Sequence, residues 1–344
     1  MANNRLRCHL PALVVVLMLL PQLVVSEDAA SADQQKASDA EHAAMQDQQP
    51  VEAMSLFGKP LRRRTFSPEE ARKLKENLAA AKKQFAEAPN NPEHIIWHGR
   101  RLAYLWRYKD AVEVFTDGIK RHTRDPRMYR HRGHRYITLR QFDKAVADLK
   151  VAAELIAGTE DKVEPDGQPN TAGKPTSSLH TNIWYHLGLA HYLNRDYEQA
   201  LTAYEKCLAA ARNNDMRVAT LDWMWMTLRK LGRVDDAAQA IAEVNEEMEI
   251  LENHAYHRRL LMYQGRLKPE DLLTIDDAAG NASAQTTKAA LDLATYGYGV
   301  GNWYAVNGQQ DKAAQIFRRV TAGEHWAAFG FIASEAELSN ADKD

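Results

Sequence analysis

The sequence contains an internal repeat, and this feature limits the possible folds more than any other. Three stretches each carry a glycine, an aromatic residue nine positions later, an alanine three positions further on, and an aromatic residue or leucine four positions beyond that. In chain order these residues are Gly99, Tyr108, Ala111 and Phe115; Gly133, Phe142, Ala145 and Leu149; and Gly188, Tyr197, Ala200 and Tyr204. The step from Ala111 to Ala145 is 34 residues. A period of this length predicts a solenoid, because one unit cannot bury its apolar face alone and neighbouring units must stack.

Two weaker copies of the pattern follow. The first keeps its alanine at Ala237 but has Trp225 where the glycine is expected. The second has Gly301 and Ala313 in place but carries Gln310 in the aromatic position. We therefore expect five units, of which the last two depart from the pattern.

These residues resemble the pattern of the tetratricopeptide-repeat family, whose unit is a pair of helices. The resemblance implies an all-α fold, a right-handed superhelical solenoid of helix-turn-helix repeats spanning residues 65–344. In such a unit the glycine lies where the two helices of a pair cross closely, and the small alanine faces it from the second helix. The expected repeats are residues 92–125, 126–158, 181–214, 218–251 and 294–327.

The composition agrees with a helical fold and narrows the classes of partner. Glycine (17) and proline (12) are scarce in a chain of 344 residues, which favours helices. A net charge of −2 gives no support for a nucleic-acid binder or a membrane-surface binder. The charge is uneven, with 14 Lys/Arg against 8 Asp/Glu in residues 92–156 and 12 against 17 in residues 195–292. Ordinary solvated faces and a polarised binding surface both remain open interpretations.

The first 26 residues are typical of a signal peptide. Arg5 and Arg7 precede an apolar stretch from Leu10 to Val25, which is short for a membrane-spanning helix. We expect export to a periplasm or secretion, with no membrane contact after removal of residues 1–26; a retained signal anchor is the alternative. Residues 27–64 are polar, without apolar periodicity, and are predicted to be a disordered tether.

Three further segments have sequence signals of their own. Ser67 and Glu70 suggest a helix start that precedes the first repeat. Residues 158–177 are rich in Gly, Pro and polar side chains and are predicted to form a loop inserted between the second and third repeats. Residues 325–338 show helical spacing of apolar side chains and are predicted to be a helix that caps the solenoid.

No motif for nucleotide binding, nucleophilic catalysis or zinc hydrolysis is present in the sequence. We therefore expect no catalytic residue, no cofactor and no metal. His131 and His134 share one helix face and are the basis of the alternative, an enzyme or metal protein with a His/carboxylate site. Arg130, Arg132 and Arg135 surround these histidines and would repel a cation.

The family resemblance also implies which side chains face the inner groove, since the first helix of each pair lines it. The candidates for partner binding are Arg100, Tyr104, Arg127, Arg130, His134, Tyr185, Tyr192, Tyr298 and Asn302. Arg and Tyr often dominate binding energy at interfaces. The sequence thus predicts an exported protein–protein interaction scaffold that binds a peptide or protein segment, acidic where it meets the N-terminal half of the groove.

Overall fold

The computed structural model describes residue 46 and residues 48–277 and 287–341. The predicted signal peptide, residues 1–26, lies outside the described residues, and so does most of the predicted tether. In the described ranges no helix is both long enough and apolar enough to span a membrane.

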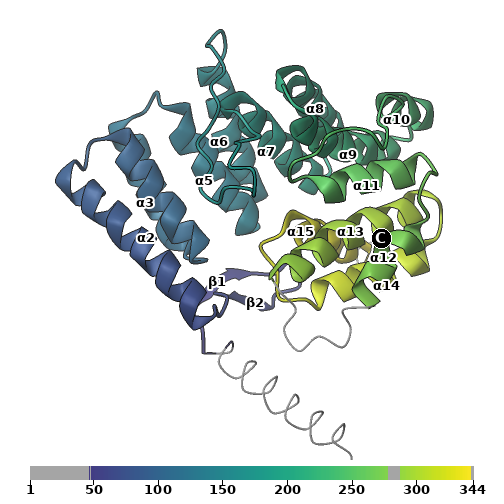
Figure 1. Cartoon of the computed structure of the whole chain (residues 1–344), viewed down its shortest axis with the longest axis horizontal. Helices are drawn as coiled ribbons and strands as arrows, with labels where there is room; N and C mark the ends of the chain where they lie inside the picture. The colour runs from purple at the N-terminus through teal and green to yellow at the C-terminus, as the bar shows by residue number, and fades with distance from the viewer. Residues whose placement is uncertain (1–45, 47, 278–286, 342–344) are drawn as a thin grey trace, which may run out of the picture. The chain divides into compact units, whose positions relative to one another are not determined.

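Helices follow one another as antiparallel pairs along the chain (Figure 1). The pairs are α3 (Pro92–Tyr104) with α4 (Tyr108–Arg121), α5 (Pro126–Thr138) with α6 (Phe142–Leu155), α7 (Leu179–Leu193) with α8 (Tyr197–Ala210), α9 (Asn214–Lys230) with α10 (Val234–Ala240), and α13 (Thr287–Val306) with α14 (Gln310–Thr321). Helix α2 (Pro68–Glu87) precedes the first pair, and Ser67 caps it by accepting a hydrogen bond from the Glu70 amide. The all-α fold class is confirmed.

The turns inside the pairs share one backbone feature. The residue two positions before each second helix has a positive φ, as at Trp106 (56°), Arg140 (61°) and Arg195 (63°). In the two weaker repeats glycines occupy the same position, Gly232 and Gly308. Glycine adopts this left-handed conformation without the steric cost that a side chain brings. The helix pairs therefore turn in the same way whether or not the residue is glycine.

The alanines and glycines of the repeat lie where the two helices of a pair meet. Ala111, Ala145, Ala200 and Ala237 are each 0% exposed. A Cβ atom built on the repeat glycine would lie under 3 Å from the partner helix, on Phe115 for Gly99, Leu149 for Gly133, Tyr204 for Gly188 and Phe317 for Gly301. The glycine is needed because the large side chain of the second helix packs directly onto the backbone of the first helix.

The fourth repeat differs from the others in its second helix. The prediction extended this repeat to residue 251, but α10 ends at Ala240 and turns follow as far as Asn253. Trp225, in the glycine position of α9, stacks face to face on Tyr263 at 3.8 Å between ring centroids. Tyr263 belongs to α11 (His254–Tyr263), which packs on α9 and α13 and is followed by α12 (Pro269–Asp277). The bulky Trp225 side chain thus faces an extra helix instead of α10.

The predicted disordered tether is wrong for residues 51–62. Strands β1 (Val51–Met54) and β2 (Pro60–Arg62) form an antiparallel hairpin in which Ala53 and Leu61 are buried. The buried Glu52 carboxylate accepts hydrogen bonds from Arg63 and from the Lys109 amide. Since the contact with Lys109 spans 57 positions of the chain, local composition alone gave no sign of it.

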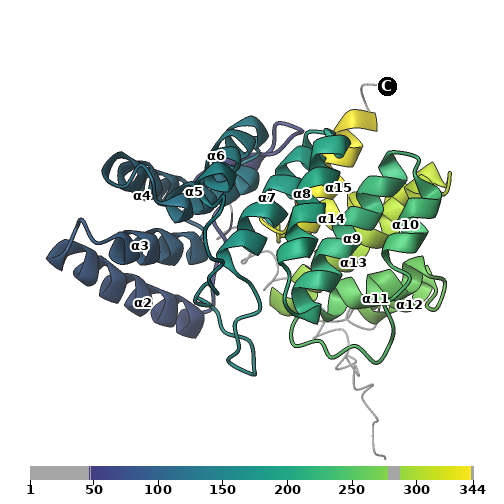
Figure 2. The same ribbon diagram turned by 90° about the horizontal axis from the view of Figure 1, so that it is seen from above.

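The last helix, α15 (Phe329–Ala341), packs on α13 and α14 and begins four residues later than the predicted cap helix. It does more than close one end of the stack. Trp326, just before it, donates a hydrogen bond to the Arg62 carbonyl at 2.7 Å and packs edge-on against Trp106 and Tyr108. Phe329, the first residue of α15, lies 5.7 Å from His186 of α7 between ring centroids, so α15 also meets a first helix of an earlier repeat; Figure 2 shows these helices from above.

Candidate functional site

The side chains predicted to line the groove lie on the first helices of the pairs, and the structure separates them into two groups. We call the side of these helices on which they lie the inner face. Its N-terminal half carries Arg100, Tyr104, Arg127 and Arg130, on α3 and α5. Its C-terminal half carries Tyr185, Tyr192, Tyr298 and Asn302, on α7 and α13.

The C-terminal half is filled by the chain itself. The Tyr192 and Tyr298 hydroxyls are 2.6 Å apart, which joins α7 to α13 by a buried hydrogen bond. Trp223 of α9 stacks on Tyr298 at 5.6 Å between ring centroids. Tyr298 and Asn302 are 0% exposed. The expectation of an open groove is therefore wrong here, because these side chains form core contacts and do not face solvent.

Two other predicted residues belong to the same buried region. The Tyr185 hydroxyl donates a hydrogen bond to Tyr256 at 3.3 Å, and the residue is 7% exposed. His134, on α5, lies with its ring centroid 4.2 Å from that of His186 and 5.3 Å from that of Phe329. Phe329 is the first residue of α15, so the C-terminal helix reaches the inner face at His134.

Two acidic residues of α15 hold it against the inner face. Glu335 pairs with Arg140 at 2.8 Å and accepts a hydrogen bond from the Leu56 amide at 2.8 Å. Glu337 pairs with Lys230 of α9 at 2.7 Å. Sequence reasoning treated this helix as a simple cap. The available signal was the presence of two carboxylates in a helix with many apolar residues, since carboxylates require cationic partners if they are buried.

The N-terminal half borders a cavity of about 880 Å³, which we call the N-terminal cleft. Trp97 and Pro165 line it together with charged side chains of both signs, which are the cations Arg100, Arg124, Arg127 and Lys162 and the carboxylates Glu93, Asp125, Glu160 and Glu164. They come from α3, from α5 with the turn before it, and from the loop at 158–177. The cleft thus contains two of the predicted groove residues, Arg100 and Arg127.

The loop at 158–177 lies against this half of the inner face. Arg100 Nη1 donates a hydrogen bond to the Pro165 carbonyl at 2.9 Å, and Arg130 Nη2 lies 2.8 Å from the Glu164 carboxylate. A Cβ atom on Gly167 would lie 1.9 Å from the Tyr104 hydroxyl oxygen, so the loop backbone touches that side chain directly. The inserted loop therefore brings one carboxylate and one main-chain carbonyl to the predicted basic residues.

The cations of the N-terminal half differ in how their charge is balanced. Arg127 pairs with Asp125 at 2.6 Å and also with Glu93, and these bonds raise the pKa of Arg127. Within the described residues, Arg100 and Arg124 have no carboxylate partner. The Arg100 guanidinium lies over the Trp97 ring, 4.4 Å from its centroid. An unpaired arginine stacked on an aromatic ring is suited to bind a carboxylate.

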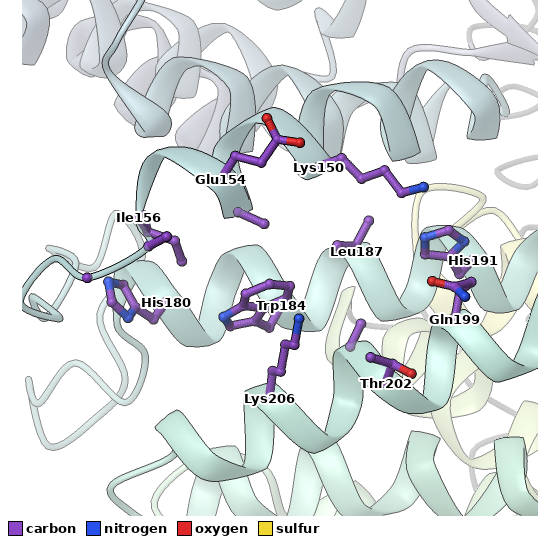
Figure 3. Close-up of a pocket in the computed structure, with 14 residues that line it drawn as sticks. Lys150, Glu154, Ile156, His180, Trp184, Leu187, His191, Gln199, Thr202 and Lys206 are labelled. Carbon is purple, nitrogen blue, oxygen red and sulfur yellow. The ribbon is translucent and has the colours of Figure 1, made fainter.

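A second cavity, of about 680 Å³, lies between α6, α7 and α8 (Figure 3). We call it the α6–α8 cleft. Ile156, Trp184 and Leu187 give it an apolar floor, with Lys150 and Glu154 above. Lys206 Nζ lies 4.5 Å from the centroid of the Trp184 ring. The sequence pattern placed Trp184 within the third repeat, 181–214, and gave no indication of a cavity beside it.

The histidines on which the metal alternative rests have the properties of core residues. Burial lowers the pKa of His131 well below 6.5, and the nearby Arg130 guanidinium acts in the same direction. Its ring stacks on Phe115 at 5.3 Å between centroids. In the part of the chain that the structure describes, no three His, Cys, Asp or Glu side chains are placed to hold a metal ion together. Burial also raises the pKa of the Cys207 thiol to about 12, which disfavours the thiolate.

Comparison with known proteins supports the repeat at its strongest copy. The family described as "Tetratricopeptide repeat" matches residues 181–214, the α7–α8 pair. No curated protein sequence matches the chain significantly.

Solved structures similar to the chain include several repeat proteins. A tetratricopeptide repeat protein from Parabacteroides merdae is 16% identical, covers 79% of this chain and 94% of its own, and has a TM-score of 0.45. YrrB, described as a repeat protein with an unusual peptide-binding site, is 14% identical over 77% of this chain and 97% of its own, with a TM-score of 0.39. MamA is 15% identical over 58% of this chain and 89% of its own, with a TM-score of 0.38.

Proposed function

We propose that this tetratricopeptide-repeat protein is an exported interaction scaffold, which binds an acidic peptide or protein segment in the N-terminal cleft. Repeat proteins of this kind present extended surfaces to partners. The C-terminal half of the inner face is taken up by α13 and α15, so the proposal assigns binding to the N-terminal half. Export rests on residues 1–26 and is checked separately below.

The observation that carries the proposal is the state of Arg100. Its guanidinium is stacked on Trp97 and donates hydrogen bonds to the Pro165 carbonyl and to the Tyr104 hydroxyl, but no described carboxylate neutralises its charge. Arg124, which is exposed, adds a second unpaired cation to the same cleft. Arginine and tryptophan are the residues that most often dominate binding energy. A carboxylate of a partner would complete this arrangement.

The loop gives an example of the chemistry that this half of the inner face accepts. Its Glu164 carboxylate pairs with Arg130, and its Pro165 carbonyl bonds to Arg100. An extended segment with acidic side chains offers both kinds of group. Such a segment would bind beside the loop or in its place.

The binding test uses a fluorescent peptide of alternating Glu and Leu residues, with a Lys–Leu peptide of equal length as the probe of opposite charge. Arg100→Glu is expected to raise the Kd for the acidic peptide at least tenfold, since it replaces attraction with repulsion at a stacked site. Arg212→Glu, an exposed and distant charge reversal, is the matched control and should change little. Circular dichroism of both variants checks that helix content is unchanged.

An equal Kd for the wild type and Arg100→Glu would reject the N-terminal cleft. Trp184→Ala in the same assay separates the two cavities, because its side chain lines only the α6–α8 cleft. If Trp184→Ala alone weakened binding, the α6–α8 cleft would be the binding surface instead.

The export part of the proposal has its own test. Mass spectrometry of the protein recovered from the native envelope or medium should find an N-terminus after about residue 26. A mature protein that keeps residues 1–26 would contradict cleavage and favour the signal-anchored alternative.

A further inference from the structure

A third cavity, of about 290 Å³, lies between α3, α5 and the segment that leads into α15. We call it the Arg135 pocket. The side chains used below are Tyr104, Tyr108, His134, Arg135, His325 and Phe329. Among its lining residues, all of which belong to the described part of the chain, there is no Asp or Glu. The pocket is therefore basic and aromatic.

Arg135 in this pocket has no balancing charge. No described residue forms an ion pair or a hydrogen bond with its guanidinium, whose nearest ring is Tyr108 at 5.3 Å. Burial lowers the pKa of Arg135 to about 10, and the nearby Arg130 and Arg100 act in the same direction. An unpaired charge in such a place is costly for the folded protein.

Other arginines that the fold encloses show what is missing. Arg140 pairs with Glu335 at 2.8 Å, Arg259 with Asp222 at 2.9 Å and Arg132 with Asp148 at 2.7 Å. In each case the fold provides a carboxylate within ion-pair distance. Arg135 differs from these three, and it borders a cavity rather than packed side chains.

We infer that the Arg135 pocket binds a small organic anion, whose carboxylate or phosphate group lies against the Arg135 guanidinium. The cavity volume is near the lower end of ligand pockets, which hold about 300–1,000 Å³. Phe329 and Ala328 offer apolar surface for the rest of the molecule. The His325 side chain also lines the pocket, and its Nδ1 atom has no hydrogen-bond partner among the described residues.

This inference is independent of the proposed peptide binding, because it concerns another cavity. The Tyr104 side chain borders the pocket from α3, and Phe329 borders it from α15. An anion bound there would touch both the first repeat and the C-terminal helix. Its binding should therefore stabilise the contact between these parts of the fold.

The test measures the midpoint of thermal unfolding, Tm, of the full chain at constant ionic strength in sodium chloride. The probes are benzoate, for a carboxylate with an apolar body, and inorganic phosphate. At about ten times its Kd, a bound probe is expected to raise the Tm of the wild type by a few degrees. A rise with benzoate alone identifies a carboxylate ligand, and a rise with phosphate alone identifies a phosphate group.

Arg135→Gln should lose this rise, whereas Arg212→Gln, which removes an exposed arginine elsewhere, should keep it. Without a probe, Arg135→Gln should be at least as stable as the wild type, since it removes an unbalanced charge. Ala328→Leu provides a second variant that fills the pocket without changing its charge, and it should also abolish the rise. The inference is overturned if neither probe raises the wild-type Tm, or if both variants keep the rise.

Discussion

The two halves of the inner face differ in what covers them. Over the N-terminal half lies the loop at 158–177, which touches it through the Glu164 carboxylate and the Pro165 carbonyl. In the C-terminal half, α7 and α13 contact each other through Tyr192 and the buried Tyr298, and α15 adds the buried Glu335. One covering is a polar segment held by hydrogen bonds and an ion pair, and the other is part of the core.

The difference follows from the side chains that the repeats present. The first helices of the early repeats carry several arginines, of which Arg100 and Arg127 remain partly exposed to water. Those of the later repeats carry Tyr185, Tyr192 and Trp223, whose apolar area must be buried. A solenoid can therefore close part of its own groove with its last helices and leave the rest for a partner.

The largest expected effect is on the C-terminal covering. Glu335→Ala should lower the free energy of unfolding by about 3–5 kcal/mol, because it leaves the buried Arg140 without a counter-charge. Arg140 and Glu335 are only 3% and 1% exposed, so water cannot replace the lost partner. Urea denaturation followed by circular dichroism measures the change.

Glu337→Gln is the matched control for Glu335→Ala. It removes a carboxylate from the same helix, but the pair with Lys230 is 22% and 15% exposed and is solvated in part. We expect a loss of about 1 kcal/mol. Equal losses for the two variants would mean that Glu335 does not fix α15 to the inner face.

The second prediction tests whether both halves rest on the same repeat packing. Gly99→Ala and Gly301→Ala should each cost about 1–3 kcal/mol of stability, because the new methyl group overlaps Phe115 in one case and Phe317 in the other. Gly158→Ala is a control that separates atomic overlap from backbone strain. Its added Cβ contacts no neighbouring atom, but a φ of 73° is unfavourable for a residue with a side chain. Two repeat variants with no effect would show that the helices cross less closely than the structure has them.

The repeat packing is also the part of the fold that the sequence predicted well. Gly188 and Tyr204 belong to a pattern that recurs along the chain, and their contact is local to one helix pair. A periodic pattern of this kind specifies which faces of the two helices in a pair must meet, independently of contacts with the rest of the molecule. The close crossing of the two helices in each pair could therefore be predicted from the pattern, whereas the inward-facing positions were only an implication of the family resemblance.

What covers those positions could not be predicted, because it depends on contacts between distant segments. Glu335 meets Arg140 across 195 residues, and Trp326 meets Arg62 across 264. Neither partner has a sequence pattern that points to the other. The same reason explains why the candidate site was predicted as one groove, although Tyr298 is buried and Arg100 is not.

The third prediction concerns pH and the contact between the two halves. Burial lowers the pKa of His186 to about 3, and Arg130 adds to the effect. Between pH 6.5 and about 3 the unfolded state therefore binds a proton that the folded state does not. Stability should fall with decreasing pH by about 1.4 kcal/mol per unit for this histidine. Urea denaturation at pH 7 and pH 5 gives the slope.

His186→Gln should reduce this slope by about 1.4 kcal/mol per pH unit, whatever it does to stability at pH 7. His180→Gln is the control, because its ring lies at the α6–α8 cleft. An unchanged slope in His186→Gln would mean that this histidine does not remain neutral when the protein is folded. Because His186 lies 5.7 Å from Phe329 between ring centroids, its protonation should loosen α15 first.

The smallest expected effect on stability is in the loop at 158–177, which covers the half of the inner face that we propose binds a partner. Glu164→Gln removes the charge that pairs with Arg130 but keeps the side chain that contacts Asn182. Because both partners are 11% exposed, we expect a modest stability loss of about 1 kcal/mol, smaller than for Glu335→Ala.

The Kd for the Glu–Leu peptide should fall by about threefold to tenfold in Glu164→Gln, since Arg130 becomes available. Asp166→Asn, a neutralisation in the same loop without an ion pair in the described residues, should leave that Kd unchanged. If both variants lowered the Kd equally, the loop would act through its net charge alone, and the Arg130–Glu164 contact would have no special part in covering the N-terminal half.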